Sequence, residues 1–441
     1  MNSDNIEKEN EESFFTTLKT KISKHIIQIL LIIGVIIAEI FFREPLFNFS
    51  LVAIPFMQKY LYYFYPVGNF FSFFATEKGL VAVIIIAYNY LNNYQTLMLL
   101  VTSLSSAYFG GVLKLIYLSP RPFMASQNVI AFGCEGGWGN PSNHALCSTC
   151  FYLSLYNIAI KPSKSYSKKQ KETMLYYIIG FIFFICFSRV FLGVHSINQV
   201  LYGSCLGLFL YYLIFHIIQI DITSSNEFLS VIYNGKLFIL GIIALIATGI
   251  IPYFVFSRNE VLIQQWDAII EAQCPGFPQA KRFEYESLMC IWGFSSIIPA
   301  IIGNCVEFFY IFDSNVTKWR RYNFSPLEEK EHNLISSEIP EEETKWNETE
   351  CGVSIKRIVI ICLVCGFLMI PHLLVSYKES FLMIITVKTL LPVYLIAFVM
   401  FSYMKTFLGV CGATNQKLFK NNLRLDEEAA INNRFELDRI A

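Results

Sequence analysis

The sequence predicts an all-α protein that crosses a membrane several times, and its composition and patterning carry this prediction. Of the 441 residues, 54% are hydrophobic and only 15% are charged, and the mean hydropathy is +0.48. The apolar residues form long uninterrupted runs instead of the alternation that a half-buried strand shows. Runs of about 20 apolar residues are long enough to cross the hydrocarbon core as helices. We therefore expect a polytopic helical membrane protein with about ten transmembrane helices.

The individual elements follow from these runs. Residues 1–25 are largely polar and lack the basic start and cleavage site of a secretory signal. The first apolar run is therefore expected to remain as a signal anchor behind a cytoplasmic N-terminal tail. The ten candidate spans are residues 26–42, 79–91, 97–118, 144–160, 174–192, 197–220, 237–256, 288–311, 358–375 and 381–407.

An aromatic stretch, residues 46–74, lies between the first two spans and contains Pro55, Pro66 and Gly68. Aromatic side chains favour the headgroup boundary, so this stretch is expected to be an interfacial or re-entrant helix pair; a further true span is the alternative. Five regions result: the tail, the anchor with this aromatic stretch (26–78), a core (79–220), additional C-terminal helices (221–410) with a polar loop at about 312–354, and a cytoplasmic tail (411–441).

Positive charge predicts the orientation of the helices. The connection 161–171 is rich in lysine, and Lys318, Arg320 and Arg321 begin another loop. Short basic connections remain in the cytoplasm, so both are expected there. The polar motifs described next lie at the opposite ends of the helices. They are expected to face the lumen or the exterior.

The cysteines and the net charge exclude other classes of protein. The twelve cysteines are scattered, many of them inside apolar runs, and no disulfide framework can be derived from their spacing. The formal net charge is zero, and the sequence has no Cys/His finger and no basic aromatic module. Nucleic acid is therefore not an expected partner.

Three short polar segments stand at the ends of predicted helices. Charged side chains beside apolar spans are costly unless they have a partner, so their grouping is informative. The segments are K-LIYLSP-R-P (114–122), P-S-N-H (141–144) and S-R-VFLGV-H-SIN-Q (188–199).

The cations and one helix start in these segments suit a phosphate group. Lys114 and Arg121 are seven positions apart, about two helical turns, and Arg121 is held between two prolines. Arg189 ends a later helix. Ser142 and Asn143 begin a helix after Pro141, where backbone N–H groups point at an anion. We expect all of them to bind phosphate.

The two histidines and a glutamine supply the chemistry. His195 is expected to attack phosphorus, and Gln199, one helical turn later, to orient its ring. His144 is expected to act as general acid and then general base. This set requires no metal and no cofactor, and the sequence has no H-E-x-x-H or similar ligand motif.

Four acidic residues outside these segments lie within or between the predicted spans. Glu39 lies within the first span, but its place near the end of that span favours a structural role. Glu135, Asp267 and Glu271 are expected on the side of the motifs. An exposed charge is the favoured interpretation for these three, with an influence on substrate access as the alternative.

The segments resemble the tripartite signature K-x6-R-P, P-S-G-H and S-R-x5-H-x3-D of the type 2 phosphatidic acid phosphatase superfamily. This superfamily includes glucose-6-phosphatases, dolichyl-pyrophosphate phosphatases and vanadium haloperoxidases, and the resemblance covers about residues 80–220. It implies a six-helix phosphatase core. Asn143 replaces the usual Gly and Gln199 the usual Asp. Gln199 and the run from Cys134 to Ala145 are similar to the glucose-6-phosphatase branch.

The resemblance implies an integral membrane phosphatase that acts through a phosphohistidine. The expected substrate is a phosphate monoester, either a lipid phosphate such as phosphatidate or a sphingoid phosphate, or a sugar phosphate such as glucose 6-phosphate. The expected location is the endoplasmic reticulum with a lumenal site, with the plasma membrane as the alternative. A non-catalytic lipid-binding or transport protein and a lipid phosphotransferase are the competing functions.

Overall fold

The structure is a computed structural model, and it describes most of the apolar part of the chain. The described residues are 26–91, 93–163, 165–218, 235–256, 260–279, 282–306, 351–376, 380, 383–404, 407–408 and 411. Helices dominate these residues, and none of them lies in a strand. The polar loop 312–354 falls almost entirely outside this part, and both expected tails fall outside it apart from Cys411.

The chain is an all-α polytopic membrane protein, but ten spans are not confirmed. Six helical stretches of the described part are long and apolar enough to cross a membrane, or seven if one bent pair of helices forms a single span. Two of the expected spans give short helices, α4 (Glu77–Tyr88) and α7 (Asn143–Leu155). The six stretches are Ile26–Phe73, Gln95–Ala125, Lys168–Phe191, Ile197–His216, Tyr285–Val306 and Ile384–Ser402.

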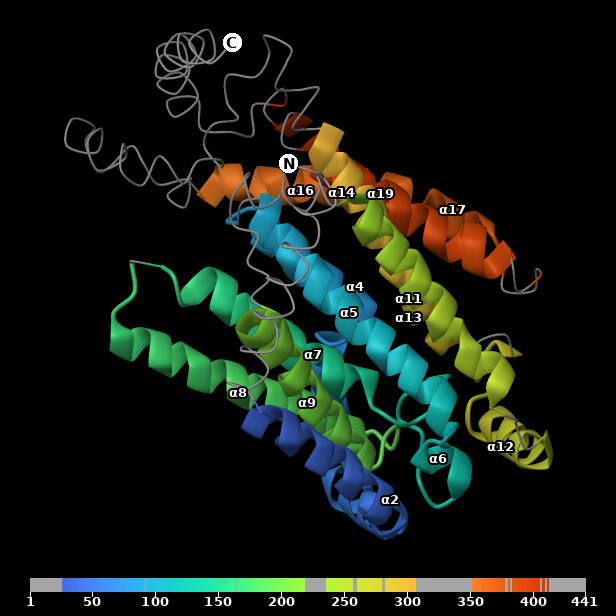
Figure 1. Ribbon diagram of the computed structural model, residues 1–441. Helices are drawn as coiled ribbons and strands as arrows, with labels where there is room; N and C mark the ends of the chain where they lie inside the picture. Colours follow the sequence, from blue (N-terminus) through green and yellow to red (C-terminus); the bar gives the residue numbers. More distant parts are fainter. Residues whose placement is uncertain are drawn as a thin grey trace, which may run out of the picture. The chain divides into compact units, whose positions relative to one another are not determined.

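The chain divides into two compact units, and the first contains all three polar segments. This unit takes its described residues from Met1–Thr76, Leu113–Asp221 and Arg258–Phe277. Figure 1 shows its longer helices in blue, green and yellow. They are α2 (Ile26–Leu61), α3 (Tyr65–Phe73), α6 (Pro122–Ala125), α7, α8 (Lys168–Phe191), α9 (Ile197–Tyr212) and α12 (Glu260–Gln273), with short turns at Tyr62–Phe64, Tyr156–Ile160 and Leu213–Ile218.

Local sequence places the boundaries of these helices. Ser142 is the N-cap of α7, where its hydroxyl oxygen accepts a hydrogen bond from the Ala145 N–H. Ser167 forms a capping box with Gln170 at the start of α8. Helices α7 and α9 pack closely because Gly207 has no side chain: a Cβ there would lie 2.4 Å from the Leu146 carbonyl oxygen.

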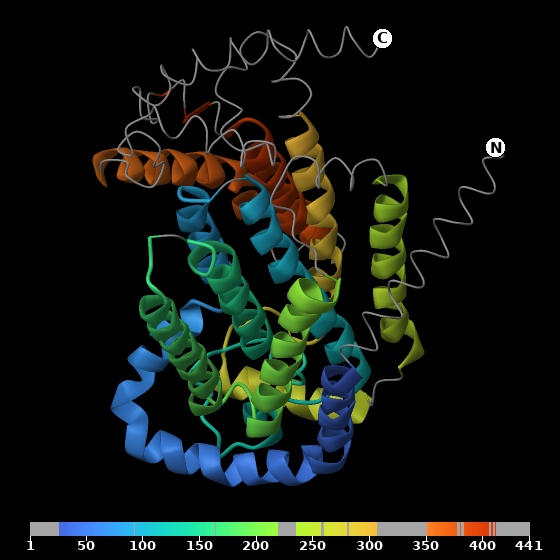
Figure 2. The ribbon, with the colours of Figure 1, turned by 60° about the vertical axis from the view of Figure 1, so that its left-hand side comes forward.

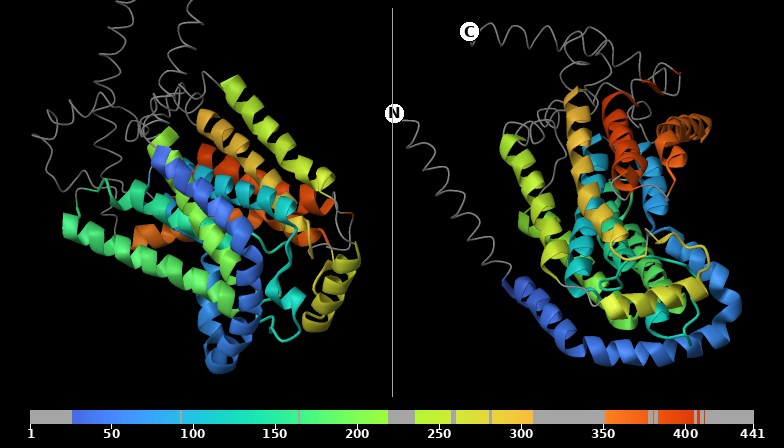
Figure 3. Two further views of the ribbon diagram at one scale, coloured as in Figure 1. Left: turned by 60° about the horizontal axis from the view of Figure 1, so that its bottom comes forward. Right: turned by 90° about the vertical axis from the view of Figure 1, so that its right-hand side faces the viewer.

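The long N-terminal helix α2 and the following α3 are curved around the ends of α8 and α9. Figure 2 shows this blue segment crossing the ends of the green helices, and α2 lies beside α9 in Figure 3. Polar side chains attach it there. The Ser50 hydroxyl accepts from the Ile197 N–H, and the Gln58 side chain donates to the carbonyl oxygens of Ile130 and Phe191. The aromatic stretch 46–74 is thus mostly helical.

Helix α12 braces the loop between α6 and α7, and it does so with a disulfide that the cysteine spacing did not reveal. Cys134 in this loop is bonded to Cys274, 140 residues later. Gln273 accepts a hydrogen bond from the Ala131 N–H, and Trp266 makes an edge contact with Trp138. The spacing of the cysteines gave no indication of this bond, because chain folding brings the two cysteines together from positions 140 residues apart.

The second unit contains the other described helices, and the three polar segments lie outside it. Its described residues come from Glu77–Val112, Ile222–Ser257 and Pro278–Ala441. Helix α14 packs on α19, and the Tyr88 hydroxyl donates to the Met400 carbonyl oxygen. The helices are α4, most of α5 (Asn93–Tyr117), α11 (Gly235–Val255), α13 (Tyr285–Gly293), α14 (Ile297–Val306), α16 (Cys351–Leu368), α17 (Ile370–Leu374) and α19 (Leu391–Ser402), with turns at Phe294–Ser296 and Ile384–Leu390.

We expect the disulfide to stabilise the first unit. Cys274→Ser should lower the free energy of unfolding by about 2–4 kcal/mol, because the bond closes a long loop in the unfolded chain. Thermal unfolding of the purified protein measures this effect. Cys362→Ser, which removes an exposed free thiol, is the matched control and should leave Tm unchanged. Equal Tm values for wild type and Cys274→Ser would contradict the stabilising role.

Candidate active site

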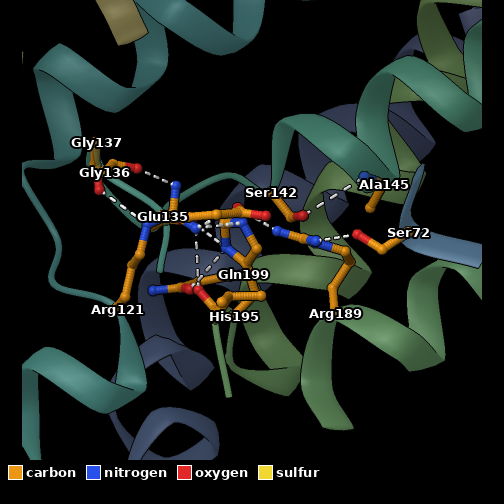
Figure 4. A network of polar contacts seen from close by, with 12 residues as sticks. Ser72, Arg121, Glu135, Gly136, Gly137, Ser142, Ala145, Arg189, His195 and Gln199 are labelled. Atoms are coloured by element: carbon orange, nitrogen blue, oxygen red, sulfur yellow. Dashed lines mark hydrogen bonds and ion pairs between the residues drawn. The ribbon is translucent and has the colours of Figure 1, made fainter. Parts of the chain in front are cut away.

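The three polar segments meet at one end of the first unit, where α5 ends, α7 begins, α8 ends and α9 begins. Figure 4 shows the side chains that converge there. Helix α5 stops because Leu118 takes a left-handed conformation, with φ of 45°, just before Pro120. Lys114, Arg121, Arg189 and His195 are each at most 1% exposed. Charges and an imidazole are therefore buried together.

The hydrogen bonds of His195 define its tautomer. Its Nε2 lies 3.0 Å from Nη1 of Arg121, which can only donate. Nε2 is therefore the unprotonated nitrogen, and Nδ1 carries the hydrogen. Nδ1 lies 2.9 Å from the Gly139 carbonyl oxygen and 3.2 Å from Oε1 of Gln199, and both accept from it. The imidazole is held neutral with its Nε2 lone pair toward the arginine.

Gln199 links three parts of the site. Its Oε1 also accepts from the Ser196 N–H at 3.2 Å, and its Nε2 donates to the Pro120 carbonyl oxygen at 2.9 Å. Gly139 must be glycine for this arrangement, since a Cβ there would lie 2.5 Å from Nε2 of Gln199. Gln199 thus makes the contact with His195 that its position predicted, and it also anchors the segment before Arg121.

Arg121 and Arg189 share one carboxylate, that of Glu135. Nη1 of Arg121 donates to Oε2 of Glu135 at 3.2 Å, and Nη2 of Arg189 donates to the same oxygen (Figure 4). Arg121 also donates to the carbonyl oxygens of Gly136 and Gly137, in the loop between α6 and α7, and to that of Val194, between α8 and α9. Arg189 donates to the Ser72 hydroxyl of α3.

The electrostatic surroundings change the pKa of two groups. Burial and the positive charges of Arg121, Arg189 and Lys114 hold the pKa of His195 well below its ordinary value. For Glu135, burial opposes ionisation, but the charges of Arg189, His144 and Arg121 hold the pKa of that carboxyl well below its ordinary value. At neutral pH the site therefore combines a neutral His195 with an ionised Glu135.

The remaining predicted residues also lie at this end of the unit. Lys114 is close enough to His195 for its charge to act on the imidazole. His144, at the start of α7, has a ring nitrogen within 4.8 Å of one in His195. Asn143 is buried beside it. The Ser142 N–H donates to the Gln199 carbonyl oxygen at 3.0 Å, so this N–H is taken up by the protein.

Sequence reasoning missed the contacts of Glu135, Ser72 and Gly139. The favoured interpretation of Glu135 as an exposed charge was wrong, because its side chain is 28% exposed and pairs with both arginines. The need of two buried guanidinium groups for an anion was the signal that could have identified it. Ser72 and the Gly139 carbonyl gave no signal in the sequence. Asp267 and Glu271 lie on α12.

An anion suits this site better than a cation does. Glu135, His144 and His195 each offer a ligand atom within 4.8 Å of the others, a spacing compatible with a metal ion. Nη1 of Arg121, however, lies against the only nitrogen lone pair of His195, and Arg189 is bonded to the carboxylate. A divalent cation would have to displace both arginines, whereas an oxyanion would gain from them.

Comparison with known proteins finds a family similar to the part of the chain that holds the three segments. Residues 95–222 match the PAP2 superfamily. This region, less than a third of the chain, is therefore similar to members of that superfamily. The matched region contains Lys114, Arg121, His144, Arg189 and His195, and it excludes α2, α3 and α12, which supply further contacts around the site. No solved structure gives a significant match.

Two curated relatives are each similar to a part of the chain. Phosphatidylglycerophosphatase B of Bacillus subtilis is 37% identical over 81 residues, which are 18% of this chain and 39% of that protein. Dolichyldiphosphatase of Saccharomyces cerevisiae is 27% identical over 165 residues, 35% of this chain and 66% of that protein. The chain thus spans less than two thirds of either relative.

The lowered pKa of His195 predicts how stability depends on pH. The folded protein keeps His195 neutral, whereas the unfolded chain binds a proton there below pH about 6.5. Its contribution to stability is therefore full above about 6.5 and is lost as pH falls, by up to about 1.4 kcal/mol per pH unit. Between pH 7 and 5.5, Tm should fall more for wild type than for His195→Asn. Parallel curves would contradict the buried neutral imidazole.

The pairing of Glu135 predicts competition with bound anions. Glu135→Gln removes the negative charge between Arg121 and Arg189 but keeps a hydrogen-bond acceptor. We expect orthovanadate to bind roughly tenfold more tightly, a gain of about 1.4 kcal/mol, because it no longer displaces a carboxylate. Titration of the purified protein, followed by thermal shift, measures this change. Weaker binding would indicate that Glu135 assists the anion instead of competing with it.

Proposed function

We propose that this chain is an integral membrane phosphatase that removes phosphate from a phosphorylated lipid. The observation that carries the proposal is the neutral His195, whose Nε2 lone pair is directed toward Arg121 in a site that also holds Arg189 and Lys114. A phosphate ester suits both features, since its oxygens need cations and its phosphorus needs a nucleophile.

In the first step the substrate phosphate replaces the carboxylate of Glu135 between Arg121 and Arg189. Nη1 of Arg121 then donates to a phosphate oxygen, and the lone pair on Nε2 of His195 is free to attack phosphorus. The P–N bond forms as the ester P–O bond breaks, and His144 gives its proton to the leaving alkoxide. The three cations neutralise the charge on the equatorial oxygens.

In the second step a water molecule attacks the phosphohistidine. His144, now neutral, takes a proton from the water, the P–N bond breaks, and inorganic phosphate leaves. During the covalent stage the imidazole ring is positively charged. The Gly139 carbonyl and Oε1 of Gln199 both accept from its Nδ1–H and stabilise that charge.

A lipid is the favoured substrate class because both relatives are named for phosphorylated lipids. A sugar phosphate is the second candidate. The observation that favours it is Gln199 together with the run from Cys134 to Ala145, which are similar to the glucose-6-phosphatase branch. A lipid phosphotransferase would share the first step and use an acceptor other than water in the second.

We further propose that the site faces the lumen of the endoplasmic reticulum or the exterior of the cell. The Cys134–Cys274 disulfide supports this side, because disulfides persist in oxidising compartments. The lysine-rich connection 161–171 supports it too, since it follows α7 at the end remote from His144 and suits the cytoplasm.

Phosphate release tests the function and the nucleophile together. The purified full-length chain is assayed in EDTA with phosphatidate, sphingosine phosphate, a prenyl diphosphate and glucose 6-phosphate. His195→Ala should lower kcat by at least about 1,000-fold, because the covalent route is lost. His216→Ala, a histidine that stacks on Tyr212 in the same unit, should retain activity. Full activity of His195→Ala would exclude the mechanism, and activity only on glucose 6-phosphate would exclude the lipid.

A further inference from the structure

A buried carboxyl group in the first helix touches both sides of the site. Oε1 of Glu39 accepts hydrogen bonds from Nδ2 of Asn140 at 2.8 Å and from Nδ2 of Asn198 at 3.2 Å. Glu39 is only 6% exposed, and both asparagines are buried. It belongs to α2, outside the matched region 95–222. A carboxyl group is costly in an apolar helix, so these two contacts need an explanation.

The two asparagines are the sequence neighbours of the groups that hold His195. Asn140 directly follows Gly139, whose carbonyl oxygen accepts from Nδ1 of His195. Asn198 directly precedes Gln199, whose Oε1 accepts from the same nitrogen. Each acceptor of the Nδ1 hydrogen is therefore one residue away from a hydrogen bond to Glu39.

We propose that Glu39 is a positioning residue for the reaction. Its carboxyl group joins the segment 139–140 to the segment 198–199, and so fixes the distance between the two acceptors of His195 Nδ1. This inference rests on the proposed role of His195 as nucleophile. It adds a residue from the N-terminal helix to a site whose other members come mostly from the matched region.

Other hydrogen bonds fix the orientation of the groups that Glu39 joins. Oδ1 of Asn198 accepts from the Ser196 hydroxyl at 2.7 Å, which leaves its Nδ2 to donate to Glu39. Two residues after the first segment, the Ser142 N–H donates to the Gln199 carbonyl oxygen of the second, so the backbones are also joined. Glu39 joins their side chains. Without it, the carboxamide groups of Asn140 and Asn198 lose a shared acceptor, and the imidazole loses its fixed direction.

A variant of Gln58 can distinguish a positioning role of Glu39 from a role in attaching helix α2 to the rest of the unit. It lies on the same helix, is buried, and makes hydrogen bonds to the backbone of Ile130 and to the Phe191 carbonyl oxygen. None of these groups holds Nδ1 of His195. Gln58→Leu therefore removes a comparable set of buried contacts between α2 and the rest of the unit, and it is the matched control for Glu39→Leu.

The experiment compares Glu39→Leu, Glu39→Gln, Glu39→Asp and Gln58→Leu in the full-length chain. Two readouts are used: kcat and KM with the substrate that wild type hydrolyses, and affinity for orthovanadate by thermal shift. Glu39→Leu should lower kcat about 100-fold, the usual effect of a displacement of about 1 Å, with KM within about twofold. Orthovanadate, which resembles the transition state, should bind more weakly in the same variant.

Glu39→Gln keeps an acceptor for both amides and should restore kcat to within about fivefold of wild type. Glu39→Asp, whose shorter side chain reaches only one amide, should have a kcat between those of Glu39→Leu and wild type. This variant provides the test if Glu39→Leu does not fold. Gln58→Leu should lower Tm but retain kcat and vanadate affinity. Unchanged kcat in Glu39→Leu and Glu39→Asp, or an equal loss in Gln58→Leu, would overturn the positioning role.

The measurement of vanadate affinity tests the positioning role of Glu39 independently of the proposed phosphatase activity. If wild type hydrolyses none of the substrates but binds vanadate, weaker binding in Glu39→Leu alone supports the positioning role although the phosphatase proposal fails. If wild type is an active phosphatase and all variants bind vanadate equally, the positioning role fails and the phosphatase proposal stands.

Discussion

The cost of holding positive charge away from water shapes this structure more than any other constraint. Lys114, Arg121 and Arg189 are almost completely buried at the end of helices that are otherwise apolar. A buried cation without compensating acceptors costs several kcal/mol. The protein meets this requirement with Glu135, with carbonyl oxygens of the loop between α6 and α7, and with the Ser72 hydroxyl. The loop, the N-terminal helices and α12 are arranged so that these acceptors are in place.

The same cations keep His195, the proposed nucleophile, neutral. Burial and the charges of these cations lower the pKa of His195, so the imidazole stays neutral although the nearby Glu135 carboxylate acts in the opposite direction. One set of charges thus serves two purposes in the proposed mechanism: it keeps a lone pair on Nε2 and it attracts the phosphate that this lone pair attacks. In that mechanism, Glu135 balances the positive charge until the phosphate of the substrate takes its place. Its partial exposure is consistent with a group that has to move aside.

The sequence predicted features that local rules determine. Prolines near Arg121, the serine cap of α7 and the four-residue spacing of His195 and Gln199 all act within one or two helical turns, so their positions could be derived. Contacts between distant parts of the chain could not. Arg189 meets Ser72 across 117 residues, and Cys134 meets Cys274 across 140. The ten predicted spans are not confirmed: six helical stretches of the described residues, or seven with the bent pair, are long and apolar enough to cross a membrane.

Gln199 makes two side-chain contacts that together require an amide group. Its amide accepts from His195 and donates to the Pro120 carbonyl oxygen, and a carboxylate can only accept. The Asp that is usual in the superfamily would be too short for both contacts and would place negative charge beside that carbonyl. Position 199 and the chain before Arg121 are therefore coupled physically in this protein. A substitution of Gln199 would release the backbone that leads into Arg121 as well as the ring of His195, so its effect would not stay confined to the imidazole.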